Sequence, residues 1–127
     1  MKSVLLSLKP EWWEKICSGE KTLEIRKSRP VDVQLPVRVI VYATKPVGMI
    51  VGEFLSGHFV RRSSVGGLVA RSMVPLQDLL AYAGGEDVFA WTIDDVVQYE
   101  TPMELTELCV KRAPQSWMYV EVDNLWP

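Results

Sequence analysis

The sequence has little of what metal sites and disulfide frameworks require. Its 127 residues include one histidine, His58, and two cysteines, Cys17 and Cys109. Metal sites built from several imidazoles and catalysis by a histidine pair are therefore excluded. The cysteines lie far apart in the sequence and have no Cys-x-x-Cys partner, so the sequence predicts neither a disulfide framework nor a cysteine-rich zinc site. We expect both cysteines to be buried as small hydrophobic residues, and we expect neither a metal nor a cofactor.

Long apolar runs are also missing. No stretch approaches the roughly 18 residues that a bilayer span needs, and Lys9-Pro10 interrupts the N-terminal segment before a secretory signal could form. The sequence therefore predicts a cytoplasmic protein without membrane contact. Apolar residues make up 48% and charged residues 24% of the chain, as in an ordinary globular domain. One hydrophobic core suits this length, so residues 1–127 are predicted to form a single domain.

Charge is small in total but uneven along the chain. The net charge of −2 argues against indiscriminate nucleic-acid binding. Residues 1–71 hold 12 Lys and Arg against 6 Asp and Glu, whereas residues 72–127 hold 2 against 10. Two interpretations stay open: the positive half presents a face to phosphate, or the two halves interleave in space and neutralise each other.

Short segments of different period alternate along the chain. A strand over residues 3–8 is followed by a two-turn helix that Pro10 opens and Gly19 closes. Further strands are expected over residues 22–27, 37–44, 49–60, 88–99 and 117–122. A second helix after Pro75 carries one apolar face, formed by Leu76, Leu79, Leu80 and Ala83, and residues 61–72 match no element. Five to six strands with two short helices predict an α+β fold, a small mixed β-barrel.

The sharpest motif is G-x-K-x-x-E-x-R, which Gly19, Lys21, Glu24 and Arg26 match. Other distinctive segments occupy residues 6–11, 42–46, 50–54 and 113–117. In this order they resemble the ASCH domain family of the PUA-like superfamily, over most of the chain. Residues 61–86 match nothing in that family.

The resemblance implies a pseudo-barrel with a cleft beside it, lined by the strand that carries Glu24 and Arg26 and by the preceding helix. ASCH and PUA-like domains are associated with RNA and with modified nucleotides. Some members only bind, some small members look like amidohydrolases of N-acetylated cytidine, and others have been assigned ribonuclease activity. RNA or a modified nucleotide is therefore the expected partner, and a metal-independent hydrolase that uses the same cleft is the alternative.

Lys21, Glu24 and Arg26 are the candidate catalytic residues if the protein is an enzyme. In a ribonuclease they would deprotonate a 2′-hydroxyl and stabilise the phosphorane. In the amidohydrolase-like members a threonine nucleophile is expected three residues after the lysine, and Glu24 stands there instead; a carboxylate cannot replace that hydroxyl, but it could activate water. The third interpretation is a structural ion-pair cluster in a protein-interaction adaptor.

Aromatic and polar residues complete the predicted binding site. Trp12 and Trp13 are adjacent on a short helix, so both cannot be buried on one stripe, and one is expected to face the cleft as a stacking platform. Basic and polar residues near strand ends could hold phosphate or ribose, and an amide could read a base edge. The predicted ligand-binding residues are Lys9, Trp12, Lys21, Arg26, Arg29, Tyr42, Thr44, Lys45, Gln115 and Ser116.

Overall fold

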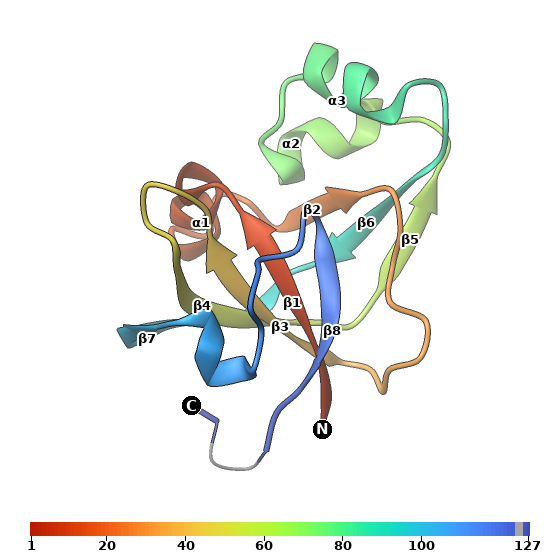
Figure 1. Ribbon diagram of the computed structural model, residues 1–127. Helices are drawn as coiled ribbons and strands as arrows, with labels where there is room; N and C mark the ends of the chain where they lie inside the picture. Colours follow the sequence, from red (N-terminus) through yellow and green to blue (C-terminus); the bar gives the residue numbers. More distant parts are fainter. Residues whose placement is uncertain (124–125) are drawn as a thin grey trace.

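Two β-sheets organise the computed structural model, which describes residues 1–123 and 126–127 (Figure 1). The larger sheet has five strands in the order β7-β4-β3-β1-β8: β1 (Lys2–Leu8), β3 (Val37–Ala43), β4 (Met49–Ser56), β7 (Asp94–Met103) and β8 (Trp117–Glu121). The smaller sheet has three in the order β2-β6-β5: β2 (Leu23–Arg26), β5 (Phe59–Arg62) and β6 (Val88–Thr92). Within the larger sheet, β1 and β3 run parallel.

Three α-helices accompany the sheets in the described part of the chain: α1 (Pro10–Cys17), α2 (Val69–Ser72) and α3 (Leu76–Ala83). Short 3-10 turns occupy Gly66–Leu68 and Leu105–Leu108. Figure 1 shows α2 and α3 together above the smaller sheet and α1 beside the larger one. The predicted α+β class is confirmed, but the predicted small mixed β-barrel of five to six strands is wrong, because eight described strands divide between two sheets that do not close into a barrel.

The miscount arises where the chain changes sheets. The apolar run over residues 49–60 divides into β4 and β5, and the run over residues 88–99 divides into β6 and β7. Thr92 stabilises the turn between β4 and β5. Its Oγ1 accepts hydrogen bonds from the backbone N–H groups of Gly57 and His58 at 3.2 and 3.1 Å. Each run has apolar residues on both sides of the break, so the sequence pattern does not reveal it, although most of β7 is exposed.

Period-two patterning builds the core. Val4, Leu6 and Leu8 of β1 pack between the two sheets, whereas Leu5 packs on the opposite face of the larger sheet. Helix α1 closes one end of the first cluster because Trp13 and Ile16 are buried there. The close approach of α1 requires glycine at position 52, where a Cβ would overlap the Trp13 ring and the Val97 carbonyl.

Helix α3 differs from its predicted packing. Leu79 and Ala83 are buried in the cluster between the smaller sheet and the helices, but Leu76 and Leu80 are 46% and 56% exposed. A helix lying on a three-stranded sheet buries a narrower stripe than four apolar positions occupy. Residues 61–72, for which the pattern predicts no element, contain the end of β5, a 3-10 turn and α2.

The two cysteines also differ from expectation. Cys17 and Cys109 are both exposed, so their predicted burial is wrong. Each lies at the end of a helical segment: Cys17 closes α1, and Cys109 follows a 3-10 turn with a left-handed φ of 58°. Among the residues that the structure describes, no helix is long and apolar enough to cross a membrane.

Candidate functional site

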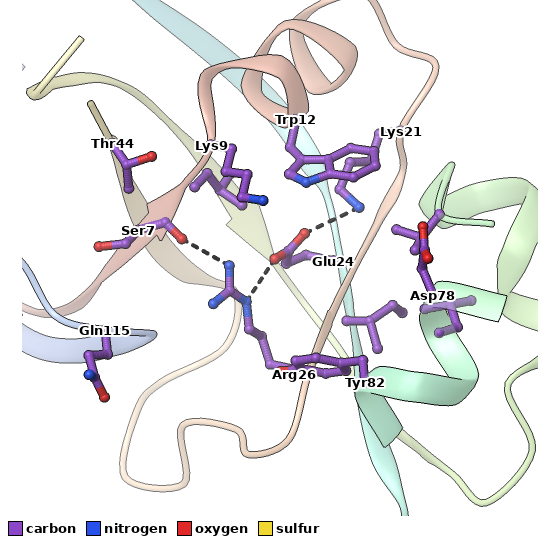
Figure 2. Close-up of a pocket in the computed structure, with 14 residues that line it drawn as sticks. Ser7, Lys9, Trp12, Lys21, Glu24, Arg26, Thr44, Asp78, Tyr82 and Gln115 are labelled. Atoms are coloured by element: carbon purple, nitrogen blue, oxygen red, sulfur yellow. Dashed lines mark hydrogen bonds and ion pairs between the residues drawn. The ribbon is translucent and has the colours of Figure 1, made fainter. Parts of the chain in front are cut away.

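A cleft of about 550 Å³ opens beside β2 (Figure 2). Its walls come from the end of β1, the start of α1, strand β2, helix α3 and the segment before β8. The volume falls within the roughly 300–1,000 Å³ typical of small-molecule pockets. Residues remote in the sequence meet here, which makes the cleft the first candidate for a functional site.

Local structure places the motif residues on this cleft. Gly19 has a φ of 85° and ends the helical segment, and the Lys21 N–H then bonds to the Lys15 carbonyl. Leu23 and Ile25 of β2 pack into the core beneath α3. Alternation along the strand therefore turns Glu24 to the other face, and all of this follows from short-range geometry.

Lys21, Glu24 and Arg26 form a charged trio, with Glu24 in the middle (Figure 2) and Arg26 partly exposed. The Lys21 Nζ lies 3.2 Å from Glu24 Oε1, and the Arg26 Nε donates to Glu24 Oε2 at 2.7 Å. Lys21 and Glu24 are only 2% and 5% exposed. Both carboxylate oxygens are thus engaged, each by a different cation.

The Arg26 guanidinium is held by three elements. Besides its bond to Glu24, its Nη1 donates to Ser116 Oγ at 3.0 Å and its Nη2 donates to the Ser7 carbonyl at 2.9 Å. The Ser7 hydroxyl in turn donates to the Pro114 carbonyl at 2.7 Å, which ties β1 to the segment before β8. The guanidinium is therefore fixed in position before any ligand arrives.

Lys21 occupies an unusual environment for an ammonium group. Burial lowers the pKa of Lys21 below its ordinary value, and Arg26 adds to that shift, whereas Glu24 opposes it. Lys21 Nζ also donates to the Ser72 carbonyl at 2.8 Å and lies 5.1 Å from the centre of the Trp12 ring. The two tryptophans separate as the helical period requires, since Trp13 is buried and Trp12 lines the cleft.

Helix α3 supplies a wall that the sequence patterns do not predict. Asp78 and Tyr82, four residues apart on one side of the helix, both line the cleft. Ser7 also contributes, through the carbonyl that binds Arg26. The polar i,i+4 pair on a predicted helix and a serine between two strand leucines were the available signals. Neither of these two signals predicts a cleft unless the segments that pack against the helix and the strand are known.

The predicted ligand-binding residues divide between the cleft and its surroundings. Those that line the cleft are Lys9, Trp12, Lys21, Arg26, Thr44 and Gln115. Ser116 takes part through its bond to Arg26.

Three of the predicted residues lie elsewhere. Arg29 is exposed, donates to the Pro30 carbonyl and lies over the Phe89 ring. Tyr42 packs on the far face of the larger sheet, and Lys45 is exposed beyond the lining of the cleft.

The two oppositely charged halves of the sequence scarcely pair with each other. In residues 1–123 and 126–127, the ion pairs that join the halves are Arg61–Asp87 and the exposed pair of the N-terminal ammonium with Glu121 at 3.2 Å. The other side-chain ion pairs lie within the N-terminal half, which argues against pairwise neutralisation. In the same residues no three His, Cys, Asp or Glu side chains are grouped closely enough to hold a metal ion.

The model of the ASCH domain matches residues 6–122. The chain belongs to the ASCH domain family. The ASCH domain is a PUA-like, RNA-binding fold, and the resemblance drawn from the sequence is confirmed.

Two relatives from Zymomonas mobilis illustrate the family. The ASCH domain-containing ribonuclease is 41% identical over 51 residues, 40% of this chain, and the match spans only 34% of that protein. The crystal structure of the ASCH protein has a TM-score of 0.80 at 27% identity, covering 94% of this chain and 87% of that one. A variant with phenylalanine in place of a tyrosine has a TM-score of 0.80 at 28% identity, with 95% and 91% covered.

Proposed function

We propose that this ASCH domain binds single-stranded RNA or a modified nucleotide in the cleft, with phosphate on Arg26 and Lys9 and the base against Trp12. The observation that carries the proposal is the trio of Lys21, Glu24 and Arg26, in which two cations meet one carboxylate at the wall of an open cleft beside a tryptophan ring. A surplus cation held rigidly beside an aromatic surface suits a phosphate joined to a base.

The donor count of Arg26 supports a phosphate at this position. A guanidinium carries five N–H donors, and the bonds to Glu24, Ser116 and Ser7 use three of them. One donor on each terminal nitrogen remains for an oxyanion. Because Arg26 is already oriented, binding a phosphate costs little side-chain entropy.

The charge of the cleft lining and the Trp12 ring also support the binding of a nucleotide. Lys9, Lys21 and Arg26 line the cleft against Glu24 and Asp78, so the lining carries one surplus positive charge when Lys21 is protonated. A base stacked on Trp12 would gain about 1–3 kcal/mol.

The proposed activity belongs to a single domain over residues 1–127 that acts in the cytoplasm. The name of the RNA-cleaving relative and the RNA-binding fold favour RNA, and the small cleft also suits a modified nucleotide. No cofactor is required for this binding.

A second candidate function, ribonuclease, rests on the lowered pKa of Lys21 and on the name of the relative. A neutral Lys21 amine would take the proton of a 2′-hydroxyl, whose oxygen then attacks the adjacent phosphorus. The bond to the 5′-oxygen breaks, that oxygen gains a proton from water, and a 2′,3′-cyclic phosphate forms. Arg26 would stabilise the phosphorane. Glu24, with both oxygens engaged, fits a positioning residue better than a base acting on water.

The test is a binding titration with short single-stranded RNA and modified nucleoside monophosphates, followed by product analysis. Arg26→Gln should weaken binding at least tenfold. Arg29→Gln, an equal charge change outside the cleft, should leave it unchanged. Products that require Lys21 would assign the ribonuclease function, whereas no binding by the wild type at low salt would refute the proposal.

A further inference from the structure

A second hollow, of about 360 Å³, lies on the face of the smaller sheet that α2 covers. Arg62 at the end of β5 and Arg71 of α2 line it, together with Ser64 and Thr92. The sheet residues Leu23, Val60 and Ala90 also line it. We call this hollow the arginine pocket. It shares no lining residue with the cleft, so it is a separate site.

The arginine pocket holds positive charge that no carboxylate balances. In the described residues neither Arg62 nor Arg71 forms an ion pair, and no acidic residue lines the pocket. Arg62 Nη1 donates to the Arg61 carbonyl at 3.1 Å, and Arg71 Nε donates to Thr22 Oγ1 at 3.0 Å. The nearby Asp87 carboxylate is engaged by Arg61 at 2.7 Å.

These contacts leave several guanidinium donors of the pocket without a protein acceptor. Arg62 and Arg71 each have a single hydrogen bond, to a neutral oxygen, out of five possible donors. Two guanidinium groups beside the hydroxyl of Ser64 form a donor set that matches the oxygens of a phosphodiester.

Consecutive residues connect the two sites. The Thr22 N–H donates to the Arg71 carbonyl at 2.8 Å, and Lys21 Nζ donates to the carbonyl of the next residue, Ser72. Lys21 lines the cleft and Arg71 lines the arginine pocket, so a single paired segment separates them. Adjacent residues of strand β2 also line different sites: Leu23 lines the arginine pocket and Glu24 lines the cleft. Figure 1 shows α2 directly above β2.

We propose that the arginine pocket binds a backbone phosphate of an RNA strand whose neighbouring nucleotide occupies the cleft. This inference rests on the proposed function and specifies its ligand as a polynucleotide. A single strand suits the arrangement, since its backbone can follow the protein surface while one unstacked base enters the cleft. A free nucleotide would fill the cleft alone and leave Arg62 and Arg71 unused.

The experiment compares a nucleoside monophosphate with a single-stranded RNA of about eight nucleotides, within the usual range of site sizes. Binding is measured over a range of salt concentrations for the wild type and for Arg62→Gln/Arg71→Gln. The control, Lys111→Gln/Arg112→Gln, removes the same charge from two exposed residues that line neither site. Circular dichroism of each variant confirms that it is folded.

The double arginine variant should bind the RNA at least tenfold more weakly and bind the monophosphate as the wild type does. The slope of log affinity against log salt should flatten by about 0.7, since the pocket is proposed to neutralise one phosphate of a single strand. The control should retain the wild-type slope. If the double variant is unfolded, Arg62→Gln alone decides, because that exposed side chain makes one local bond; it should weaken RNA binding and leave the monophosphate affinity unchanged.

Equal RNA affinity and slope in the wild type and in the folded arginine variant would overturn the arginine pocket as an RNA site. An equal loss in the control would do the same, since it would indicate a general charge effect. Wild-type binding of the monophosphate without tighter binding of the RNA would refute this inference and leave the proposed function standing. Wild-type binding of neither ligand would refute both.

Discussion

Two buried glutamates on different sheets make similar contacts and have different consequences. Glu24 lies on β2 of the smaller sheet and Glu53 on β4 of the larger one, and they are 5% and 9% exposed. Each uses both carboxylate oxygens, one on an arginine and one on a second donor. The two glutamates differ in the charge of the second donor, which is neutral at Glu53 and positive at Glu24.

Around Glu53 the charges balance. Arg38 Nε lies 3.3 Å from Glu53 Oε2, and the Tyr99 hydroxyl donates to Oε1 at 2.6 Å. Burial and the bond to the glutamate raise the pKa of Tyr99 well above its ordinary value, so the phenol is neutral at physiological pH. The Trp126 indole N–H donates to the same hydroxyl and completes the network.

Around Glu24 the second donor is Lys21, a second cation, and the trio faces a cleft. One positive charge is therefore left over where a ligand can reach it. The comparison teaches that similar carboxylate contacts can leave a different net charge, and of the two clusters the trio presents surplus charge at a cleft.

Neutralising Glu24 and Glu53 in turn should give the largest difference in the free energy of unfolding. Glu24→Gln leaves the buried Lys21 and the partly buried Arg26 without a counter-charge, which should lower the free energy of unfolding by about 3 kcal/mol. Glu53→Gln leaves one partly exposed cation and a neutral phenol and should cost about 1–2 kcal/mol. Urea unfolding of both variants measures the difference. Equal losses would show that the surplus charge of the trio has no energetic consequence.

Truncating a tryptophan in each network should separate binding from stability. Trp12→Ala should weaken RNA binding by roughly tenfold or more, since stacking of a base contributes about 1–3 kcal/mol. Trp126→Ala should leave RNA binding unchanged, because it removes only the donor to Tyr99. Calorimetric titration of both variants tests this. Comparable loss of affinity in the two would contradict the placement of the base on Trp12.

The pH dependence should reveal what Lys21 does. Its pKa in the folded protein lies below 10.5, so RNA affinity should fall as pH rises through that lowered value and the ammonium charge is lost. Cleavage by a Lys21 base would instead rise through the same pKa. Lys21→Arg, which stays protonated, should abolish the alkaline fall in affinity. An identical fall in that variant would mean that another group is responsible.

The lowered pKa of Lys21 should also make the free energy of unfolding depend on pH. Between the folded pKa of Lys21 and 10.5, the unfolded chain binds more protons than the folded one. The contribution of Lys21 to the free energy of unfolding therefore increases with pH across that window. Comparing urea unfolding of the wild type and Lys21→Met at several alkaline pH values isolates this contribution, and parallel profiles would contradict it.

The smallest effect is expected at the phenol. Tyr99→Phe removes one hydrogen bond to Glu53 and should lower the free energy of unfolding by about 1 kcal/mol, with RNA affinity unchanged. Urea unfolding and an RNA titration measure the two quantities. A large loss of affinity would mean that the Glu53 network communicates with the cleft.

Much of the cleft was predictable because its geometry is local. Pro10 and Gly19 bound a short helix, and alternation along β2 places Glu24 opposite its apolar neighbours. The same short-range rules separate Trp12 from Trp13. The α+β class follows from the brief alternation of strand and helix patterns. The family resemblance also came from short segments, and from their order along the chain.

What surrounds the motif was decided by tertiary contacts. Ser7 and Ser116 hold Arg26 because β1 passes beside the segment that enters β8, and α3 brings Asp78 and Tyr82 to the cleft. No local sequence pattern predicts these contacts between distant segments.

The sequence by itself therefore determined the α+β class, the motif and the charge that Lys21, Glu24 and Arg26 bring to one strand and its turn. Only the tertiary structure decided that the strands form two open sheets, and that, among the residues it describes, Asp87 pairs with Arg61 while Arg62 has no carboxylate partner. The physical reason is range: periodicity and turns depend on neighbouring residues, whereas sheet order and charge pairing depend on which distant segments the fold brings together.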